Sequence, residues 1–351
     1  MKKKLIFVTR QPGTANAFIP LIKALQQGSE FEITILAYAI SFEALANAAL
    51  AFHKIEKFSD ALRYLNPDID YLVTGTSEKV TDDELFWRWA NENHVPSLAF
   101  VDQWSNLTQR FECENLPASI AVMDEAAKKA LESYLSGRSQ VLITGSPAFD
   151  TLKDTVKAFP RMSSQTRILF VLEPDISGQT EDEIRARQGF TEYDCLRASV
   201  KATCDYARQH GIPIVFTLKP HPRDDQERIQ GLITKLHADV SELPVEIWAR
   251  SRVEALVESD VVMGMRSMLL LEAAIVHKPV ISIQLNRKTP CMLTDDRQQI
   301  KLAVTEEKIG QYLHAGLTTP SAQEDGADIQ PFNATERFLK ILRGNVHSST
   351  F

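Results

Sequence analysis

Short runs of β-branched and aliphatic residues alternate along this chain with longer stretches of helical periodicity, and this alternation is the strongest constraint on its fold. The first part of the sequence predicts strands at residues 5–8, 32–36, 71–73, 98–101, 120–122 and 141–143. Amphipathic helices are predicted between them, at residues 16–25, 42–50, 82–93 and 125–134. Strands and helices in this order favour a parallel sheet that is covered by helices.

The alternation stops at residues 153–165 and then begins again. This stretch has mixed charge, Pro160 and two adjacent serines, which is typical of a linker between domains. Beyond it, strands are predicted at residues 168–172, 214–218, 245–248, 261–263 and 280–283, a loop at 318–328, and helices at 193–210, 224–235, 252–257, 267–276 and 336–342. A chain of 351 residues has room for two cores. We therefore predict an α/β protein with Rossmann-like domains at residues 1–155 and 156–351, whose last helix can pack back on the first domain.

The charge balance argues against nucleic acid as a partner. The chain has 39 basic and 46 acidic residues, so its net charge is −7 and small molecules are the expected partners. Lysines at residues 2–4 resemble the start of a signal peptide, but only four apolar residues follow them, which is too few for its hydrophobic region. No run approaches the roughly 18 apolar residues of a transmembrane helix, so we expect any membrane association to be peripheral.

Cysteine spacing and short motifs bear on cofactors and metals. The four cysteines lie far apart without a CxxC pair, so no zinc site or disulfide framework is predicted and the cytoplasm is the expected setting. The chain has no GxGxxG or GxxxxGK[ST] motif, which disfavours a dinucleotide-dependent oxidoreductase and a P-loop NTPase. Asp68 and Asp70 have the D-x-D spacing of a metal site, but they precede a strand and so lie at the edge opposite the expected ligands. No cofactor and no metal site are predicted.

Polar loops follow several predicted strands. In an open parallel sheet, ligands bind beyond the carboxyl ends of the strands, where loops lead into helix N-termini. In the first domain these loops are residues 10–14, 74–77, 102–106 and 144–147. In the second domain they are residues 219–223 and 264–267. We expect the two sets of loops to face each other across a cleft between the parallel sheets.

Asp102 is the leading candidate for a catalytic base. It ends an apolar strand and precedes Gln103, Trp104 and Asn106, which combine stacking and hydrogen-bonding groups. The alternative is structural, because an aspartate after a strand often forms a turn or caps a helix.

Residues 219–223, K-P-H-P-R, are the strongest single signal. Lys219, His221 and Arg223 place three potential cations within five positions, and the two prolines between them fix the backbone. This arrangement favours binding of a phosphate, with a solvated turn as the alternative. His221 could donate a hydrogen bond or act as a titrating acid, and the sequence leaves both roles open.

A second candidate phosphate site begins at Gly264. This glycine permits close approach of a ligand to the backbone, and Ser267 is expected to cap the helix that follows. Free amide groups and the helix dipole there favour an anion, although any helix needs a cap. Glu272 stands in an otherwise apolar stretch, so its carboxylate either pairs with a cation or accepts hydrogen bonds from a ligand such as a ribose diol.

Taken together, these positions resemble the GT-B glycosyltransferases, which have two Rossmann domains, and the related non-hydrolysing UDP-GlcNAc 2-epimerases. Gly13 and the residues that follow it are similar to the first glycine loop and helix of these proteins. Residues 141–150, V-L-I-T-G-S-P-A-F-D, are similar to their V-T-G-N-P segment, with Ser146 in place of asparagine. The resemblance implies a GT-B-like fold over nearly the whole chain.

Two segments of the second domain resemble nucleotide-sugar sites. The K-P-H-P of residues 219–222 is similar to an element of bacterial sialyltransferases, Kdo-transferases and glycerophosphotransferase-like proteins, in which His-Pro contacts the donor phosphates. Residues 264–282 are similar to the G-x-S-x-x-x-x-E-A-x-x-x-x-K-P-V segment of the same superfamily. That likeness implies donor contacts from Arg266, Ser267 and Glu272.

The resemblance implies a metal-independent glycosyltransferase of surface-polysaccharide or glycoconjugate synthesis, with a UDP- or CMP-linked sugar donor and a glycan or lipid-linked acceptor. The cations of residues 219–223 and Arg266 would offset the negative charge that develops on the departing phosphate. The D/E-D/E-G signature of sialyltransferases is absent, so the sugar is not specified. The His-Arg pairing of the epimerases has no clear counterpart in residues 219–223, which places a nucleotide-sugar 2-epimerase second. A non-catalytic nucleotide-binding or assembly protein on the same scaffold is the third possibility.

Overall fold

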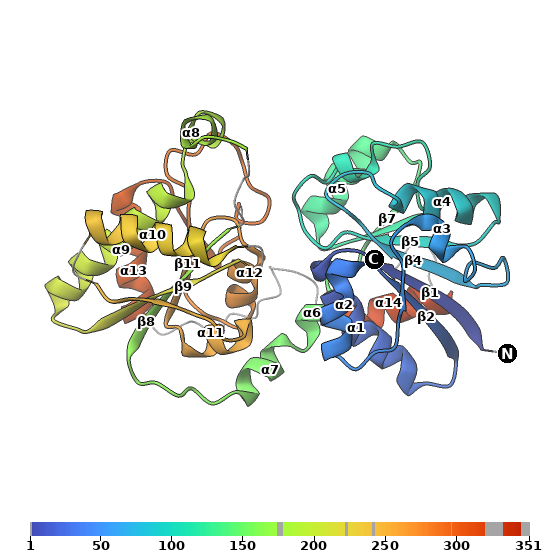
Figure 1. The fold of residues 1–351 in the computed structure, drawn as a ribbon, viewed down its shortest axis with the longest axis horizontal. Coiled ribbons are helices and arrows are strands. Elements are labelled where there is room, and N and C mark those ends of the chain that lie inside the picture. The colour runs from blue at the N-terminus through green and yellow to red at the C-terminus, as the bar shows by residue number, and fades with distance from the viewer. Residues whose placement is uncertain are drawn as a thin grey trace. The chain divides into compact units, whose positions relative to one another are not determined.

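The structure, a computed structural model, describes residues 2–173, 178–221, 224–240, 243–295, 297–319 and 333–344. It divides into two compact units, each built around one sheet (Figure 1). Unit 1 comprises Met1–Thr151 together with Gln330–Phe351, and unit 2 comprises Leu152–Ile329. The end of the chain therefore belongs to unit 1.

The sheet of unit 1 has seven strands in the order β3-β2-β1-β4-β5-β6-β7. They are β1 (Lys3–Thr9), β2 (Phe31–Ala37), β3 (His53–Lys54), β4 (Tyr71–Gly75), β5 (Ser97–Phe100), β6 (Ser119–Val122) and β7 (Gln140–Ile143). All neighbouring strands are parallel. β5 and β6 are buried along their whole length, so their sequences are continuous apolar runs bounded by serine rather than alternating patterns.

Helices cover this sheet, and one of them comes from the end of the chain. They are α1 (Pro12–Gln27), α2 (Phe42–Asn47), α3 (Phe58–Ala61), α4 (Asp83–Glu92), α5 (Glu125–Leu135), α6 (Pro147–Asp150) and α14 (Ala334–Arg343). The ring of Phe338 in α14 packs against that of Phe100 in β5, with centroids 5.5 Å apart. The first two amide groups of α14 donate to the Asp150 carboxylate at 2.9 and 2.7 Å, which suits the positive end of a helix dipole.

The sheet of unit 2 has six strands in the order β10-β9-β8-β11-β12-β13, again all parallel. They are β8 (Thr166–Val171), β9 (Ile214–Lys219), β10 (Val245–Ile247), β11 (Val261–Gly264), β12 (Val280–Ile283) and β13 (Ile300–Ala303). The helices are α7 (Leu152–Ala158), α8 (Glu181–Gln188), α9 (Glu192–His210), α10 (Gln226–Asp239), α11 (Arg252–Glu258), α12 (Met268–Ile275) and α13 (Glu306–Thr318). None of the helices in the described ranges is long and apolar enough to cross a membrane.

Both sheets reverse their strand order around the first strand of the unit. β1 lies between β2 and β4, and β8 lies between β9 and β11. This doubly wound topology confirms the prediction of two parallel-sheet, Rossmann-like domains. In such folds ligands bind beyond the carboxyl ends of the strands next to the reversal, so the loops after β1, β4, β8 and β11 are the ones to inspect.

The predicted strands are all present, and the elements that the sequence analysis missed have weak local signals. The first part of the expected linker, residues 153–158, is helical as part of α7, which begins with a buried leucine, Leu152, despite its mixed charge. α13 contains Gly310 and Gly316, which disfavour a helix, yet Ile309 and Leu313 bury its inner face. Of the expected loop at 318–328, residues 320–328 lie outside the described ranges.

Candidate functional site

In unit 1, Asp102 and Gly13 meet at the carboxyl edge of the sheet. Asp102 lies two residues beyond β5, and Gly13 lies in the first turn of α1, which follows β1. A Cβ atom on Gly13 would stand 2.2 Å from Oδ2 of Asp102. Only glycine therefore allows this carboxylate to approach the N-terminus of α1, where the helix dipole favours negative charge. The sequence singled out both residues but gave no sign that they touch.

Asp102 faces an arginine that the sequence analysis missed. Nη1 of Arg110 lies 3.6 Å from Oδ1 of Asp102, and the Arg110 side chain is 1% exposed. Nη1 also donates to Oγ1 of Thr76 at 2.8 Å, and Nε donates to the carbonyl of Ser105 at 3.2 Å. Burial raises the pKa of the Asp102 carboxyl, and the Arg110 guanidinium opposes that rise. Arg110 stands in a short 3-10 turn rather than at a strand end, so only tertiary structure reveals it.

This pair is incompletely satisfied. Oδ1 of Asp102 and Nη2 of Arg110 are buried, and neither makes a hydrogen bond with any residue in the described ranges. A buried carboxylate with a raised pKa and unused hydrogen-bonding capacity can accept a proton from a bound molecule. Trp104 does not offer a stacking surface beside it, because its ring is buried and Nε1 donates to Asp124 at 2.8 Å.

Arg10 is a second residue that the sequence analysis passed over, although it directly follows β1. Its guanidinium lies 3.7 Å from the ring centroid of Tyr38, and Nη2 is 3.4 Å from Oδ2 of Asp82. Nε and Nη2 are buried without a hydrogen bond to the described residues. The loop after β1 therefore carries a fixed cation as well as the N-terminus of α1.

Two other acidic residues of unit 1, Asp83 and Asp70, have structural partners. Asp83 in the first turn of α4 is buried and accepts the Ser77 amide at 3.0 Å. Asp70 accepts the Lys4 amide at 2.8 Å, at the amino edge of the sheet. The described residues of either unit contain no group of three histidine, cysteine, aspartate or glutamate side chains that could hold a metal ion.

In unit 2, the K-P-H-P-R loop begins where β9 ends. Nζ of Lys219, the last residue of β9, donates to the carbonyl of Arg250 at 3.0 Å, and burial lowers the pKa of its amine. The His221 amide donates to Oδ2 of Asp224 at 2.8 Å. Arg223 lies outside the described residues.

The loop after β11 brings Arg266 to the same edge. Gly264 ends β11, and a Cβ there would lie 3.2 Å from the Val171 carbonyl of β8, so tight packing of adjacent strands already favours glycine. Ser267 caps α12, as predicted, by accepting the Leu269 amide at 3.3 Å. The backbone amide of Arg266 donates to the Glu173 carboxylate, and Nη2 donates to Oε1 of Gln188 at 2.9 Å.

Glu272 pairs with a cation, which is one of the two roles that the sequence left open. Its side chain is 7% exposed, and Oε1 accepts a hydrogen bond from the Arg252 guanidinium. Oε2 is buried and accepts no hydrogen bond from the part of the chain that the structure describes. Burial raises the pKa of the carboxyl, against the effect of Arg252. One oxygen is thus fixed by the protein, and the other can serve a ligand hydroxyl.

The sequence analysis also missed two buried carboxylates, Glu173 and Glu192. Glu173 lies two residues beyond β8, so the strand-end rule could have found it. Glu192 begins α9 and resembles an ordinary first-turn acid in sequence. Burial raises the pKa of Glu192 to about 7, although Arg228 lowers it.

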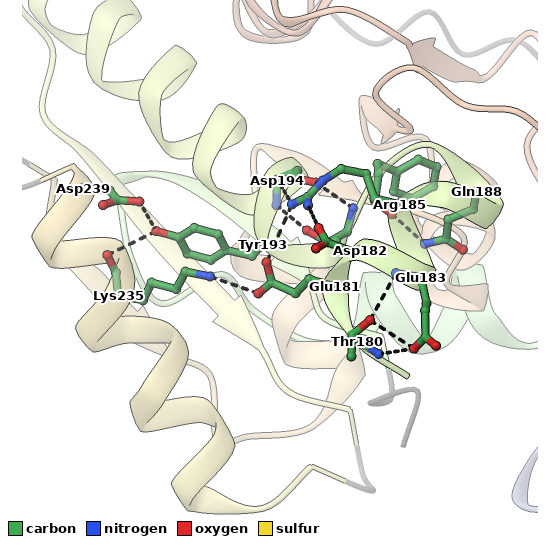
Figure 2. A network of polar contacts seen from close by, with 12 residues as sticks. Thr180, Glu181, Asp182, Glu183, Arg185, Gln188, Tyr193, Asp194, Lys235 and Asp239 are labelled. Atoms are coloured by element: carbon green, nitrogen blue, oxygen red, sulfur yellow. Dashed lines mark hydrogen bonds and ion pairs between the residues drawn. The ribbon is translucent and has the colours of Figure 1, made fainter. Parts of the chain in front are cut away.

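A separate set of polar contacts fixes α8, α9 and α10 beside this edge. Figure 2 shows Arg185 of α8 paired with Asp194 of α9, and Tyr193 bonded to Asp239 of α10. Nζ of Lys235 lies 3.0 Å from Oε1 of Glu181, which joins α10 back to α8. Gln188, at the end of α8, is therefore held in place where it meets Arg266.

The fold is shared with nucleotide-sugar enzymes. The UDP-GlcNAc 2-epimerase from Neisseria meningitidis, solved with UDP-GlcNAc, is 15% identical, with a TM-score of 0.67 over 97% of this chain and 100% of that one. HepE from Anabaena, solved with UDP and glucose, is 10% identical, with a TM-score of 0.63 over 98% and 100%. MurG from Acinetobacter baumannii is 12% identical, with a TM-score of 0.54 over 97% and 99%.

These likenesses confirm the predicted GT-B-like fold of two Rossmann-like domains. No protein-family model and no curated protein matches the chain. The narrower resemblance of residues 219–222 to sialyltransferases stays a prediction.

Proposed function

We propose that the chain is an enzyme that acts on a nucleotide-activated sugar and transfers the sugar to a glycan or lipid-linked acceptor. The observation that carries the proposal is Glu272, whose buried Oε2 has no hydrogen-bond partner among the described residues while Arg252 fixes Oε1. A buried carboxylate oxygen needs a hydrogen-bond donor, and a ribose diol supplies two adjacent ones.

The cations of unit 2 fit the diphosphate of the same donor. Lys219 ends β9, His221 follows it, and Arg266 follows β11, so all three belong to one sheet edge together with the N-terminus of α12. These groups can stabilise the negative charge that develops on the departing phosphate. UDP is the first nucleotide to test because HepE and the Neisseria enzyme were solved with UDP or a UDP-sugar, and CMP is the second.

Asp102 is the proposed base. A transferase of this kind must take a proton from the acceptor hydroxyl as that oxygen attacks the sugar. The raised pKa of the buried Asp102 carboxyl makes it a stronger base than an exposed aspartate, and Arg110 favours the charged carboxylate that must be present before the proton is taken. His221 is the candidate acid or hydrogen-bond donor toward the leaving phosphate.

A nucleotide-sugar 2-epimerase is the second candidate. Its support is the likeness to the Neisseria epimerase, whose TM-score of 0.67 exceeds the 0.54 of MurG. An epimerase needs no acceptor and leaves a rearranged sugar still linked to its nucleotide. A transferase releases free nucleotide only when an acceptor is present.

Binding and turnover experiments separate these possibilities. We expect UDP to stabilise the wild type in a thermal-shift assay, and we expect Arg266→Gln to reduce the shift. Arg167→Gln is the control, because Arg167 also pairs with a carboxylate, that of Glu246, but touches neither phosphate loop. Millimolar UDP and CMP that shift no melting temperature would contradict the proposal.

Product analysis then assigns the reaction. UDP-GlcNAc is incubated with the protein, with and without a pool of glycan acceptors, and followed by proton NMR. A new UDP-linked anomeric signal without acceptor identifies an epimerase, and acceptor-dependent UDP release identifies a transferase. Binding without either product, unaffected by Asp102→Asn, identifies a non-catalytic nucleotide-binding protein.

A further inference from the structure

The His221 and Arg266 loops of unit 2 are joined by an unbroken series of polar contacts. At one end, the Arg266 backbone amide donates to Oε1 of Glu173, and Nη2 lies 3.5 Å from Oε2 of the same carboxylate. The Glu173 amide in turn donates to Oε1 of Glu192 at 2.7 Å. The loop after β11 is thereby fixed to the end of β8 and to the first turn of α9.

The series continues from Glu192 to the other loop. Oε2 of Glu192 accepts a hydrogen bond from Nη2 of Arg228 in the first turn of α10. Nη1 of Arg228 donates to Oδ1 of Asp224 at 2.6 Å, and Oδ2 of Asp224 accepts the His221 amide at 2.8 Å. The Asp224 side chain is 1% exposed, so water competes little for these bonds.

Glu192 and Arg228 stand in the middle of this series and touch neither loop. Each Glu192 oxygen has a different partner, Glu173 on one side and Arg228 on the other. The planar guanidinium of Arg228 holds two carboxylates at once in a fixed fork, which a lysine cannot reproduce. The contacts of α8, α9 and α10 in Figure 2 fix the helices from which both side chains extend.

We propose that Glu192 and Arg228 are positioning residues, which hold the His221 and Arg266 loops at one fixed spacing for the binding of a nucleoside diphosphate. This inference rests on the proposed function for the identity of the ligand. The series itself is a property of the loops and can be tested without any ligand.

Glu192→Gln is the variant of choice because it keeps the shape and interrupts the series. A glutamine carbonyl can serve only one of the two donors, and its NH2 group then faces the other donor. The fold is expected to tolerate it, since burial already raises the pKa of this carboxyl to about 7 and favours a neutral group there. Arg167→Gln is again the control. Arg228→Lys tests whether the guanidinium must hold both carboxylates at once.

The first measurement is amide hydrogen exchange in the full chain without ligand. We expect exchange at the amides of His221 and Arg266 to become about tenfold faster in Glu192→Gln and to stay at the wild-type rate in Arg167→Gln. Glu192 contacts neither amide, so faster exchange at these two amides, without faster exchange in the core strands, would be transmitted through the series. Unchanged exchange at His221 or at Arg266, with the fold intact, would overturn the proposal.

The second measurement is UDP binding by calorimetry at pH 8, where Glu192 is mostly charged in the wild type. We expect the Kd to rise about tenfold in Glu192→Gln and in Arg228→Lys, with melting temperatures close to wild type. In the wild-type background, His221→Ala and Arg266→Ala should have non-additive effects on the free energy of UDP binding. In the Glu192→Gln background, their effects on this free energy should add.

The two proposals fail in different ways. If the wild type binds neither UDP nor CMP, the proposed function fails, and with it the binding of a diphosphate by the loops. If the wild type binds UDP and Glu192→Gln binds it equally well, the positioning proposal alone is overturned.

Discussion

The candidate residues of unit 1 and unit 2 are buried to a similar extent but satisfied differently. In unit 1, Asp102 and Arg110 are 3.6 Å apart and each keeps a buried atom without a hydrogen bond to the described residues. In unit 2, the carboxylates of Glu192 and Asp224 have a partner for each oxygen. The difference indicates which residues can take part in a reaction. Buried polar atoms without a hydrogen bond can bind a substrate, whereas fully hydrogen-bonded ones keep the structure rigid.

Glu272 supports this distinction from within unit 2. Only one of its carboxylate oxygens accepts a hydrogen bond from Arg252. Like Asp102, it therefore keeps a buried oxygen without a hydrogen bond to the described residues. Unit 2 therefore contains both a rigid series of contacts and an unsatisfied group beside it. The predictions below test whether the two kinds of carboxylate behave differently.

The largest expected effect follows from breaking the pair in unit 1. Arg110→Gln leaves the Asp102 carboxylate buried without a counter-charge, which we expect to cost about 3–5 kcal/mol of unfolding free energy. Urea unfolding followed by tryptophan fluorescence measures it. Arg88→Gln is the control, because Arg88 forms only an exposed pair with Glu92 and its loss should change little. A loss as small as that of the control would mean that Asp102 is already neutral.

A pH dependence is expected from the saturated carboxylate of unit 2. The pKa of Glu192 is about 7 in the fold against 4.5 for the free side chain, so the folded state binds more protons between these values. Stability from this group is therefore present below about pH 4.5 and declines as pH rises to about 7, by at most about 3 kcal/mol. The difference in melting temperature between wild type and Glu192→Gln, followed from pH 5 to pH 8, measures it. A difference in melting temperature that does not change with pH would show that Glu192 does not titrate between pH 5 and pH 8.

A smaller effect is expected at the contact between α1 and Asp102. Gly13→Ala would place a Cβ 2.2 Å from Oδ2 of Asp102, so the carboxylate must move. We expect a loss of about 1–3 kcal/mol in stability and a larger fall in turnover than in UDP affinity, because Asp102 is the proposed base. Gly137→Ala is not a suitable control because its φ of +82° adds strain, whereas Gly231→Ala in α10 meets no atom within 4 Å. Equal losses of turnover and UDP affinity would argue against the role of Asp102.

The smallest effect is expected from metal removal. Neither unit has a three-residue metal-ligating group among its described residues, and cations of the protein are proposed to meet the phosphates. Turnover and UDP binding should therefore change less than about twofold when EDTA replaces Mg²⁺. A loss of turnover that Mg²⁺ restores would contradict the proposed metal independence and would indicate that a metal carried by the nucleotide takes part.

Much of the fold could be predicted because its signals are local. Continuous apolar runs such as residues 98–101 and 261–263 are long enough to identify buried parallel strands. The strand-end rule then placed Asp102, Lys219 and Arg266 at the correct edges of their sheets. β13 and α13 were missed because Lys301 and two glycines weaken their patterns, and their stability comes from packing against the rest of unit 2.

The sequence by itself determined the kind of element at each position and therefore which side chains stand near a ligand-binding edge. Only the tertiary structure decided which of those side chains meet. Arg110 reaches Asp102 and Arg228 reaches Glu192 because strand order and helix packing bring together segments whose spacing in the sequence carries no such information. Hydrophobic periodicity is read along the chain, whereas the pairing of buried charges depends on distances across it.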